Sequence, residues 1–249
     1  MLHNPAAPTT TSLDNPIAVM QRFELKYIMT PAQEAQLKRA MEGHMTPDQF
    51  GLTSIASLYY DTPDARLIRA SLEKPKFKEK LRLRSYGLAT EFSPVYLELK
   101  RKVEGVVYKR RVQTTARQAV EFLAGKSSLG LAGQIGRELT AFRDYYETLV
   151  PACMIIYDRT AYIEADGDLR LTIDGNPRYR SEHLGMTHSM EGTSLLPPGC
   201  SILELKVQSA VPLWLTKALS EAKLYQTSFS KYGEAYRREL QAHSMRTAS

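Results

Sequence analysis

Alternation of hydrophobic and polar residues with a period of two recurs along the chain. Such alternation is typical of strands that bury one face and leave the other face polar. The run Leu97-Glu98-Leu99-Lys100 is a clear example. The pattern covers residues 22–27, 53–61, 78–86, 95–102, 106–113, 155–164, 169–174 and 202–207. We therefore predict about eight β-strands.

Helix signals lie between these strands. Thr30 to Gln33 has the composition of a capping box with Pro31 at the first helical position, which predicts a helix to about residue 41. Thr62-Pro63 predicts a further short helix, and residues 115–124, 131–148, 211–222 and 230–242 also have helical character. The three segments between residues 78 and 113 follow one another without a crossover helix, which favours antiparallel pairing. The predicted class is α+β, a large antiparallel sheet or barrel with helices outside.

One domain, residues 20–242, is predicted. Residues 1–19 are rich in Pro, Thr, Ala and Asn and are expected to be disordered, and residues 243–249 are expected to form a flexible tail. Residues 181–200 contain Gly, Ser, His and a Pro197-Pro198 pair, which predicts a long loop.

The polar positions of the predicted strands are mostly charged. Side chains on one face, opposite the hydrophobic ones, are Arg22, Glu24, Lys26, Arg82, Arg84, Glu98, Lys100, Lys102, Arg170, Thr172, Asp174, Glu204 and Lys206. A solvated face explains any single strand. Five strands carry charged residues in this way. Like charges side by side would be destabilising unless an anion lay among them, so the pattern favours a bound anion. Arg and Lys suit phosphate oxygens, whereas Glu among them suits Mg²⁺ or Mn²⁺ bridging to the phosphate.

The overall charge agrees with an anionic partner. The 249 residues include 33 Lys and Arg against 27 Asp and Glu, a net charge of +6. Nucleic acid, phosphate compounds and an acidic membrane surface all remain open. The two cysteines, Cys153 and Cys200, fit a reducing compartment. The first 15 residues have no signal-peptide pattern, and no stretch reaches the ~20 apolar residues of a membrane span, so we expect a cytoplasmic protein.

Seven short motifs in order resemble a known family. They are Glu24-Leu25-Lys26-Tyr27, Tyr59-Tyr60-Asp61-Thr62, residues 80–87, Leu97-Glu98-Leu99-Lys100, residues 157–162, Leu203-Glu204-Leu205-Lys206 and Phe229-Ser230-Lys231-Tyr232. Over about residues 20–240 the chain resembles the catalytic domain of the vacuolar transporter chaperone (VTC) polyphosphate polymerases, which belong to the triphosphate tunnel metalloenzymes.

This resemblance implies a closed antiparallel β-barrel, or tunnel, in which the terminal phosphate of ATP is transferred to a growing polyphosphate chain. It also implies Mn²⁺ or Mg²⁺ as cofactor. The residues expected to grip phosphates are Lys26, Arg82, Arg84, Lys100 and Arg159, with Arg170 and Lys206 on the same faces, and Lys231 beside Ser230 is expected to cap the substrate at the tunnel mouth. Glu204 is expected to hold the metal with help from Glu24 and Glu98, Glu98 alternatively orienting Lys100. A separate membrane protein could attach the domain to the inner face of a membrane.

Departures from the family pattern leave other functions open. Hydrolytic members of the superfamily open with two alternating Glu before a Lys, whereas this chain has Arg22 and then Glu24. The alternatives are a tunnel triphosphatase, a non-catalytic polyphosphate-binding module and a nucleic-acid-binding barrel. The last ranks lowest because the basic positions carry no aromatic pattern for base stacking. Asp174 is interpreted either as a metal ligand or general base, or as a structural partner of Arg170 or Arg178.

Overall fold

The computed structural model describes residues 23–73, 76–104, 106–131, 133–164, 168–208 and 210–247. The segment 1–19, for which disorder was predicted, and Arg22 lie outside these ranges. The strands are β1 (Phe23–Met29), β2 (Met45–Pro47), β3 (Thr53–Asp61), β4 (Phe77–Tyr86), β5 (Pro94–Val103), β6 (Val106–Thr115), β7 (Val150–Glu164), β8 (Arg170–Arg180), β9 (Thr193–Ser194) and β10 (Ser201–Val207). Every predicted strand is present, and the α+β class is confirmed.

Two strands extend beyond their predicted limits. β7 begins at Val150 rather than at residue 155, because its first half is apolar on both faces and shows no alternation. β8 continues past Asp174 to Arg180 through Gly175-Asn176-Pro177, a sequence typical of a turn. The strand tolerates it because the β7–β8 register shifts between Ile156 and Asp158, where Asn176 has a φ of 47°. β2 and β9, with three and two residues, are too short to show a period in the sequence.

The helices are α1 (Pro31–Met41), α2 (Arg66–Leu72), α3 (Ala116–Leu123), α4 (Gln134–Tyr146), α5 (Leu213–Glu221) and α6 (Lys231–Thr247). The predicted capping box is confirmed: the Gln33 amide donates to the Thr30 hydroxyl, and the Thr30 amide donates back to the Gln33 side chain. α6 continues to Thr247, beyond residue 242 where the sequence predicted its end. No helix in the described part of the chain is long and apolar enough to cross a membrane.

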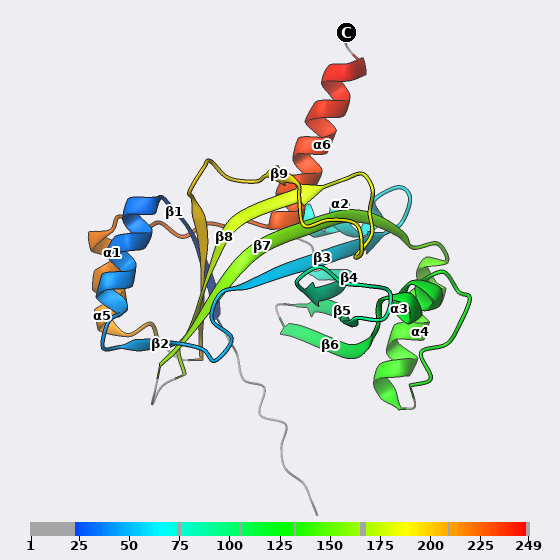
Figure 1. Cartoon of the computed structure of the whole chain (residues 1–249), viewed down its shortest axis with the longest axis horizontal. Coiled ribbons are helices and arrows are strands. Elements are labelled where there is room, and N and C mark those ends of the chain that lie inside the picture. Colours follow the sequence, from blue (N-terminus) through cyan, green and yellow to red (C-terminus); the bar gives the residue numbers. More distant parts are fainter. Residues whose placement is uncertain are drawn as a thin grey trace, which may run out of the picture.

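The sheet is antiparallel throughout, in the order β1-β10-β8-β7-β3-β4-β5-β6, with β2 and β9 attached to β7 and β8. The predicted closed barrel is wrong, because β1 and β6 end the sheet without pairing to each other within the described ranges. The outer edge of β1 is occupied instead: Tyr27 bridges Gln226, and the Thr227 amide donates to the Lys26 carbonyl at 2.8 Å. The sheet therefore curves without closing (Figure 1).

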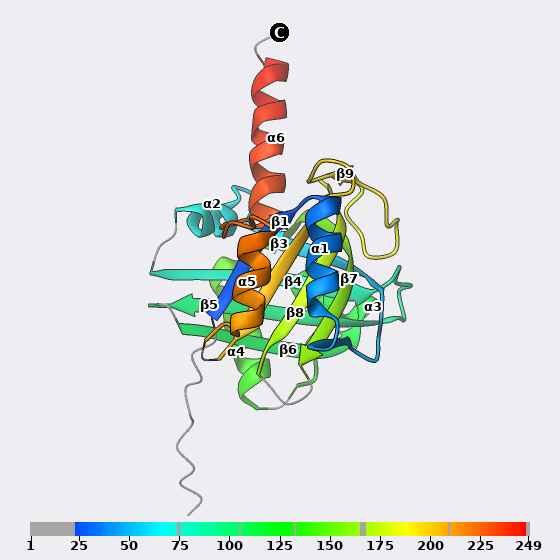
Figure 2. The same cartoon turned by 90° about the vertical axis from the view of Figure 1, so that its left-hand side faces the viewer.

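Helices cover the outer face of this curved sheet in two groups. α1 and α5 pack on β1, β8 and β10, where Leu37 and Leu215 join Leu171 and Leu205 in one buried cluster (Figure 2). α3 and α4 supply Phe122 and Phe142 to a second cluster over β3, β4 and β5, which includes Leu58, Leu81 and Leu97. Burying these leucines outward leaves the alternate, charged positions on the other face.

We call that other face the inner face. Register places on it Glu24, Lys26, Lys206, Glu204, Arg170, Thr172, Asp174, Arg159, Tyr157, Ser57, Tyr59, Lys78, Lys80, Arg82, Arg84, Glu98, Lys100, Lys102, Lys109 and Arg111. One end of it is covered by α2 and α6, whose Ile68 and Tyr232 cluster with Tyr59 and Ile155. Figure 1 shows α6 rising from this end of the sheet.

Candidate functional site

Side chains from opposite ends of the sheet meet over the inner face. Lys100 Nζ on β5 lies 3.8 Å from Glu24 Oε2 on β1, although five strands separate β1 from β5 in the sheet. Lys80 on β4 donates to the hydroxyl of Ser230, which directly precedes α6, at 3.4 Å. The curvature therefore brings side chains from the two halves of the inner face into contact.

We call the half formed by β1, β10, β8 and β7 the mixed wall, because carboxylates and cations alternate on it. Lys26 Nζ lies 3.2 Å from both Glu24 and Glu204. Burial would lower the pKa of Lys26, but Glu204 and Glu24 outweigh burial and raise it. Burial would likewise raise the pKa of Glu204, but Lys231, Lys26 and Arg159 hold it well below its ordinary value. These groups are charged at neutral pH.

Asp174, fully buried, is the second centre of the mixed wall. Arg159 donates to both of its oxygens, at 2.6 and 2.8 Å, and Lys231 Nζ donates to Oδ2 at 2.5 Å. The same two cations lie 3.4 and 3.7 Å from Glu204. Arg170 and Arg178, the partners considered from the sequence, make no ion pair with Asp174. Arg178 pairs with Asp158 at 3.3 Å instead.

Lys231 reaches this wall from the first turn of α6. The preceding residues are held on the edge of β1 by the Thr227–Lys26 hydrogen bond, and the Glu234 amide donates to the Ser230 carbonyl at 2.8 Å as the helix begins. Lys231 Nζ lies 4.5 Å from the centre of the Tyr157 ring, and the Arg159 guanidinium lies over the same ring at 5.1 Å. The backbone pairing at the edge of β1 and the contact with the Tyr157 ring thus fix the position of the Lys231 ammonium group.

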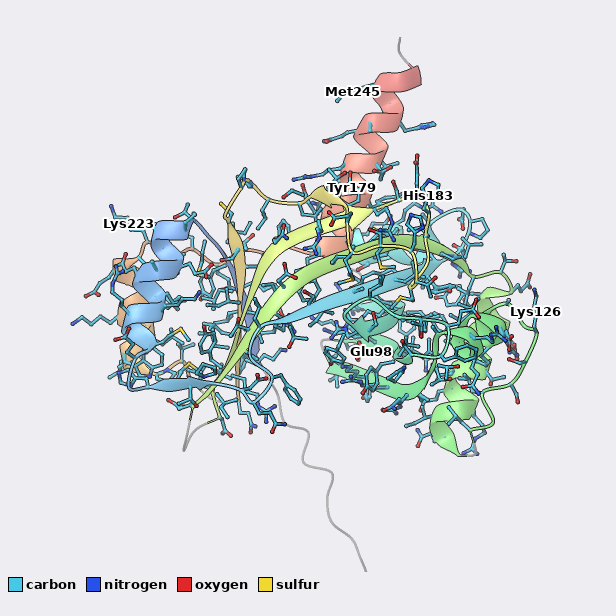
Figure 3. The ribbon with its side chains drawn as sticks, in the orientation of Figure 1. Glu98, Lys126, Tyr179, His183, Lys223 and Met245 are labelled. Carbon is cyan, nitrogen blue, oxygen red and sulfur yellow. The ribbon has the colours of Figure 1, made fainter. Side chains whose placement is uncertain are left out.

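We call the half formed by β4, β5 and β6 the basic wall. Among the described residues, Glu98, 2% exposed, is the one carboxylate that this wall places on the inner face. Figure 3 labels it among the strands β4, β5 and β6. Four cations surround it: Arg82 at 2.7 Å, Lys109 at 3.0 Å, Arg111 at 3.6 Å and Arg84 at 3.8 Å. Burial would raise the pKa of Glu98, but Arg82, Arg84 and Lys109 lower it to about 2.

Tyrosine and serine hydroxyls fix the arginines of the basic wall. Arg82 donates to the Tyr59 hydroxyl at 2.9 Å. Arg84 donates to the Tyr157 hydroxyl at 3.2 Å and to the Ser57 hydroxyl at 3.4 Å. Burial would raise the pKa of Tyr59, but Arg82, Lys80 and Arg84 outweigh it and lower the pKa to about 8. The guanidinium groups of Arg82 and Arg84 are therefore held in place before any ligand binds.

Every predicted site residue lies on the inner face or at its rim. Lys26, Glu24, Glu204, Arg159 and Lys231 form one ion-pair network, and Arg82, Arg84 and Glu98 form another. Lys100 reaches Glu24 rather than Glu98, so Glu98 does not orient Lys100. Arg170 and Lys206 oppose each other in register and make no ion pair with any side chain in the described ranges.

Several site residues were not predicted as phosphate ligands. Lys80 shares the alternation of Arg82 and Arg84, so the pattern contained the signal for it. Lys109 and Arg111 alternate along β6, and both lie on the inner face beside Glu98. Tyr59 faces Arg82, while Tyr60, the next residue along β3, belongs to the hydrophobic core. Tyr157 belongs to the motif at residues 157–162, but the sequence assigned no role to it, and none to Ser57.

The carboxylates of the mixed wall fit a hard divalent cation in part. Carboxylate oxygens are the ligands of Mg²⁺ and Mn²⁺, and Mg²⁺ often uses one or two of them together with substrate phosphates. Thr172, opposite Glu204 in register, contributes a buried hydroxyl without a hydrogen-bond partner at the same place. Within the described ranges, no three His, Cys, Asp or Glu side chains converge as a complete metal cage. Glu98 shares no cation with Glu24 or Glu204.

Comparison with known proteins identifies one family. Residues 21–239 match the model of the VTC domain. A solved structure from Bacillus halodurans, provisionally assigned as an adenylate cyclase, has a TM-score of 0.53 and 14% identity over 83% of this chain and 92% of its own. A structure from Vibrio parahaemolyticus with the same provisional assignment has a TM-score of 0.45 and 11% identity over 86% and 97%. The first likeness supports the fold alone. No curated protein gives a significant match.

Proposed function

Because the chain belongs to the VTC domain family, we propose that it is a metal-dependent polyphosphate polymerase, which transfers the terminal phosphate of ATP to a growing polyphosphate chain. One observation carries this proposal: seven cations from six different elements converge on one face of the sheet. They are Lys26, Arg82, Arg84, Lys100, Arg159, Lys206 and Lys231. Such an array suits a linear phosphate compound better than a single phosphate group.

Positioning and charge stabilisation are the main demands of phosphoryl transfer. Arg159 and Lys231 are both held by ion pairs to Asp174 and Glu204, which fixes their positions on the inner face. In our proposal these two cations stabilise charge on the transferred phosphoryl group, and Lys26 holds the neighbouring phosphates. An oxygen of the terminal phosphate of the chain forms a bond to the γ-phosphorus, the bond from that phosphorus to the oxygen of ADP breaks, and ADP leaves.

Mg²⁺ or Mn²⁺ would be held by Glu204 together with Asp174 or Glu24. The ion would neutralise charge on the phosphate oxygens and help to orient them. We assign Glu98 to the positioning of Arg82, Arg84, Lys109 and Arg111 rather than to the metal, because those four cations surround it. ATP and polyphosphate are the proposed partners. A cytoplasmic location and attachment through a membrane protein are also proposals.

Phosphorus NMR of the purified protein with ATP and Mn²⁺ or Mg²⁺ tests the reaction. We expect internal chain-phosphate signal to grow as ATP falls, and to be lost in Arg159→Ala. The control is Arg110→Ala, which removes a similarly half-buried arginine paired with Glu138 on the outer face. Orthophosphate as sole product would favour the triphosphatase. Unchanged ATP would favour a binding module, and full activity of Arg159→Ala would refute the site.

Glu204→Gln tests the metal separately. The substitution keeps the shape of the side chain and removes its charge, so the metal concentration for half-maximal activity should rise at least about tenfold, which corresponds to ~1.4 kcal/mol of lost metal affinity. Glu91→Gln, on an exposed carboxylate paired with Arg117, is the control. An unchanged metal titration in Glu204→Gln would count against Glu204 as a ligand.

A further inference from the structure

The two walls of the inner face differ in charge. The mixed wall has five cations, Lys26, Arg159, Arg170, Lys206 and Lys231, and three carboxylates, Glu24, Asp174 and Glu204, which leaves a net charge of +2. The basic wall has eight cations, Lys78, Lys80, Arg82, Arg84, Lys100, Lys102, Lys109 and Arg111, and only Glu98, which leaves +7. Most of the net positive charge of the inner face, among the residues that the structure describes, therefore belongs to β4, β5 and β6.

Lysines face one another directly across the basic wall. Lys80 opposes Lys100, and Lys100 opposes Lys109 on the next strand, so three lysines occupy directly opposed positions on three neighbouring strands, whose backbones span about 10 Å. Lys78 opposes Lys102 one step further along the same strands. Like charges in directly opposed positions destabilise a sheet. Two members of the row have a carboxylate partner: Lys109 pairs with Glu98, which three arginines also contact, and Lys100 lies 3.8 Å from Glu24 of the mixed wall. One carboxylate on the basic wall still faces eight cations.

Lys80 is strongly affected by this arrangement. Burial, together with the repulsion of Lys78, Lys100 and Lys26, lowers the pKa of Lys80 to about 8, against the opposing effect of Tyr59. A sheet that keeps such a row is best matched by a ligand with closely spaced negative charges and no cation of its own. Phosphate groups in a metal-free chain have that property.

We infer that the two walls bind different substrates. The basic wall holds a metal-free linear polyphosphate, the acceptor, and the mixed wall holds the metal-bound triphosphate of the donor. A metal-bound triphosphate is partly neutralised and needs carboxylates for its metal, whereas a bare polyphosphate needs uncompensated cations. This inference rests on the proposed function and adds to it the place of each substrate.

The contacts between the walls put the two substrates within reach of each other. Lys100 of the basic wall touches Glu24 of the mixed wall, and Lys80 touches Ser230, the residue before Lys231. The transferred phosphoryl group thus moves from the mixed wall to the basic wall. ADP remains on the mixed wall, and the chain on the basic wall is longer by one phosphate.

Binding measurements without turnover test the inference. Titration calorimetry would compare tripolyphosphate in EDTA with the β,γ-methylene analogue of ATP in Mn²⁺. Three double variants each remove two positive charges: Lys102→Gln/Lys109→Gln on the basic wall, Arg170→Gln/Lys206→Gln on the mixed wall, and Arg110→Gln/Arg117→Gln outside the inner face. Circular dichroism would check that each variant folds.

We expect the basic-wall variant to lose at least about tenfold in tripolyphosphate affinity and less than about threefold in affinity for the nucleotide analogue, and the mixed-wall variant to show the reverse. The outer variant should lose neither. Equal losses of tripolyphosphate affinity in both inner variants, or a wild type that binds tripolyphosphate only with metal, would overturn the inference. Because nothing is turned over, failure of polymerase activity by NMR remains a separate result. Should the basic-wall variant fail to fold, Lys102→Gln alone, at a half-buried lysine, is the substitute.

Discussion

Glu98 and Arg82 face each other in register on β5 and β4, and the carboxylate accepts a hydrogen bond from Arg82 Nε at 2.8 Å. Arg111 lies opposite Glu98 on the other neighbouring strand. One buried carboxylate thus holds guanidinium groups from both sides, in the place where an anionic ligand would bind them.

Glu98→Gln should therefore destabilise the ligand-free protein. Removing one partner of a buried charge cluster costs roughly 3–5 kcal/mol, because the remaining charges are left unpaired. Urea unfolding should show this loss as a lower midpoint. Tripolyphosphate should raise the midpoint of Glu98→Gln more than that of the wild type, since the anion replaces the missing charge. Equal stabilisation of both proteins would show that Glu98 does not occupy a phosphate position.

Lys80 makes anion binding dependent on pH. Its pKa of about 8 means that it loses its charge as the pH rises from about 7 to about 9, and Tyr59, also near 8, gains a negative charge over the same range. Both changes weaken the binding of a polyanion, so tripolyphosphate affinity should fall several-fold over this range. Binding near pH 8 should take up protons, measurable by calorimetry in buffers with different ionisation enthalpies.

Lys80→Arg is the informative variant for this pH dependence. An arginine stays charged throughout, so only the part due to Tyr59 should remain, and Tyr59→Phe should remove that part. Lys126→Arg, on a segment after α3, is the control and should keep the wild-type profile. A wild-type affinity that does not change between about pH 7 and 9 would rule out Lys80 and Tyr59 as the titrating groups.

Lys231→Gln should reduce turnover of ATP at least about tenfold while the protein stays folded. The lost ion pair leaves Asp174 with two hydrogen bonds from Arg159, so the free energy of unfolding should fall by only about 1–2 kcal/mol. Lys231→Arg restores the charge and should recover part of the activity. Arg237→Gln, exposed on the same helix, is the control. Wild-type turnover in Lys231→Gln would remove Lys231 from the site.

Asp61→Asn should loosen the covered end of the inner face. The buried Asp61 carboxylate accepts from the amides of Thr62, Leu67 and Ile68 at 2.8–2.9 Å and from the Tyr232 hydroxyl at 3.0 Å, so it ties α2 and α6 to the end of β3. The side-chain NH₂ of Asn would face backbone amides and a hydroxyl that are themselves donors. The free energy of unfolding, measured in urea, should therefore fall by about 2–4 kcal/mol. Asp64→Asn, on an exposed neighbour, should leave the midpoint unchanged. Similar midpoints for the two variants would contradict this role.

The charged face could be predicted because burial requires it. Leu81, Leu83, Leu97 and Leu99 are almost fully buried against the helices, so their period fixes where the alternate residues point. The same reasoning locates Lys80, which shares the period of Arg82. Local sequence also contained the capping box at Thr30.

Closure and pairing depend on distant residues and could not be predicted. The outer edge of β1 is occupied by Gln226 and Thr227, some 200 residues further along the chain, rather than by β6. The partner of Asp174 is likewise set by the place where α6 delivers Lys231. No period within a strand contains that information.

The ion pair between Glu24 and Lys100 has a consequence for the handling of polymers. A barrel joined by a continuous backbone ladder admits a long chain only by threading from one end. Here the two halves meet at a seam of side chains, Lys100 with Glu24 and Lys80 with Ser230, rather than through a backbone ladder in the described ranges. Glu24 and Lys100 are 35% and 49% exposed, and such a pair contributes only about 0–1 kcal/mol. The seam can part and re-form at little cost. A polyphosphate far longer than the protein could then be laid in sideways and released from any point along its length.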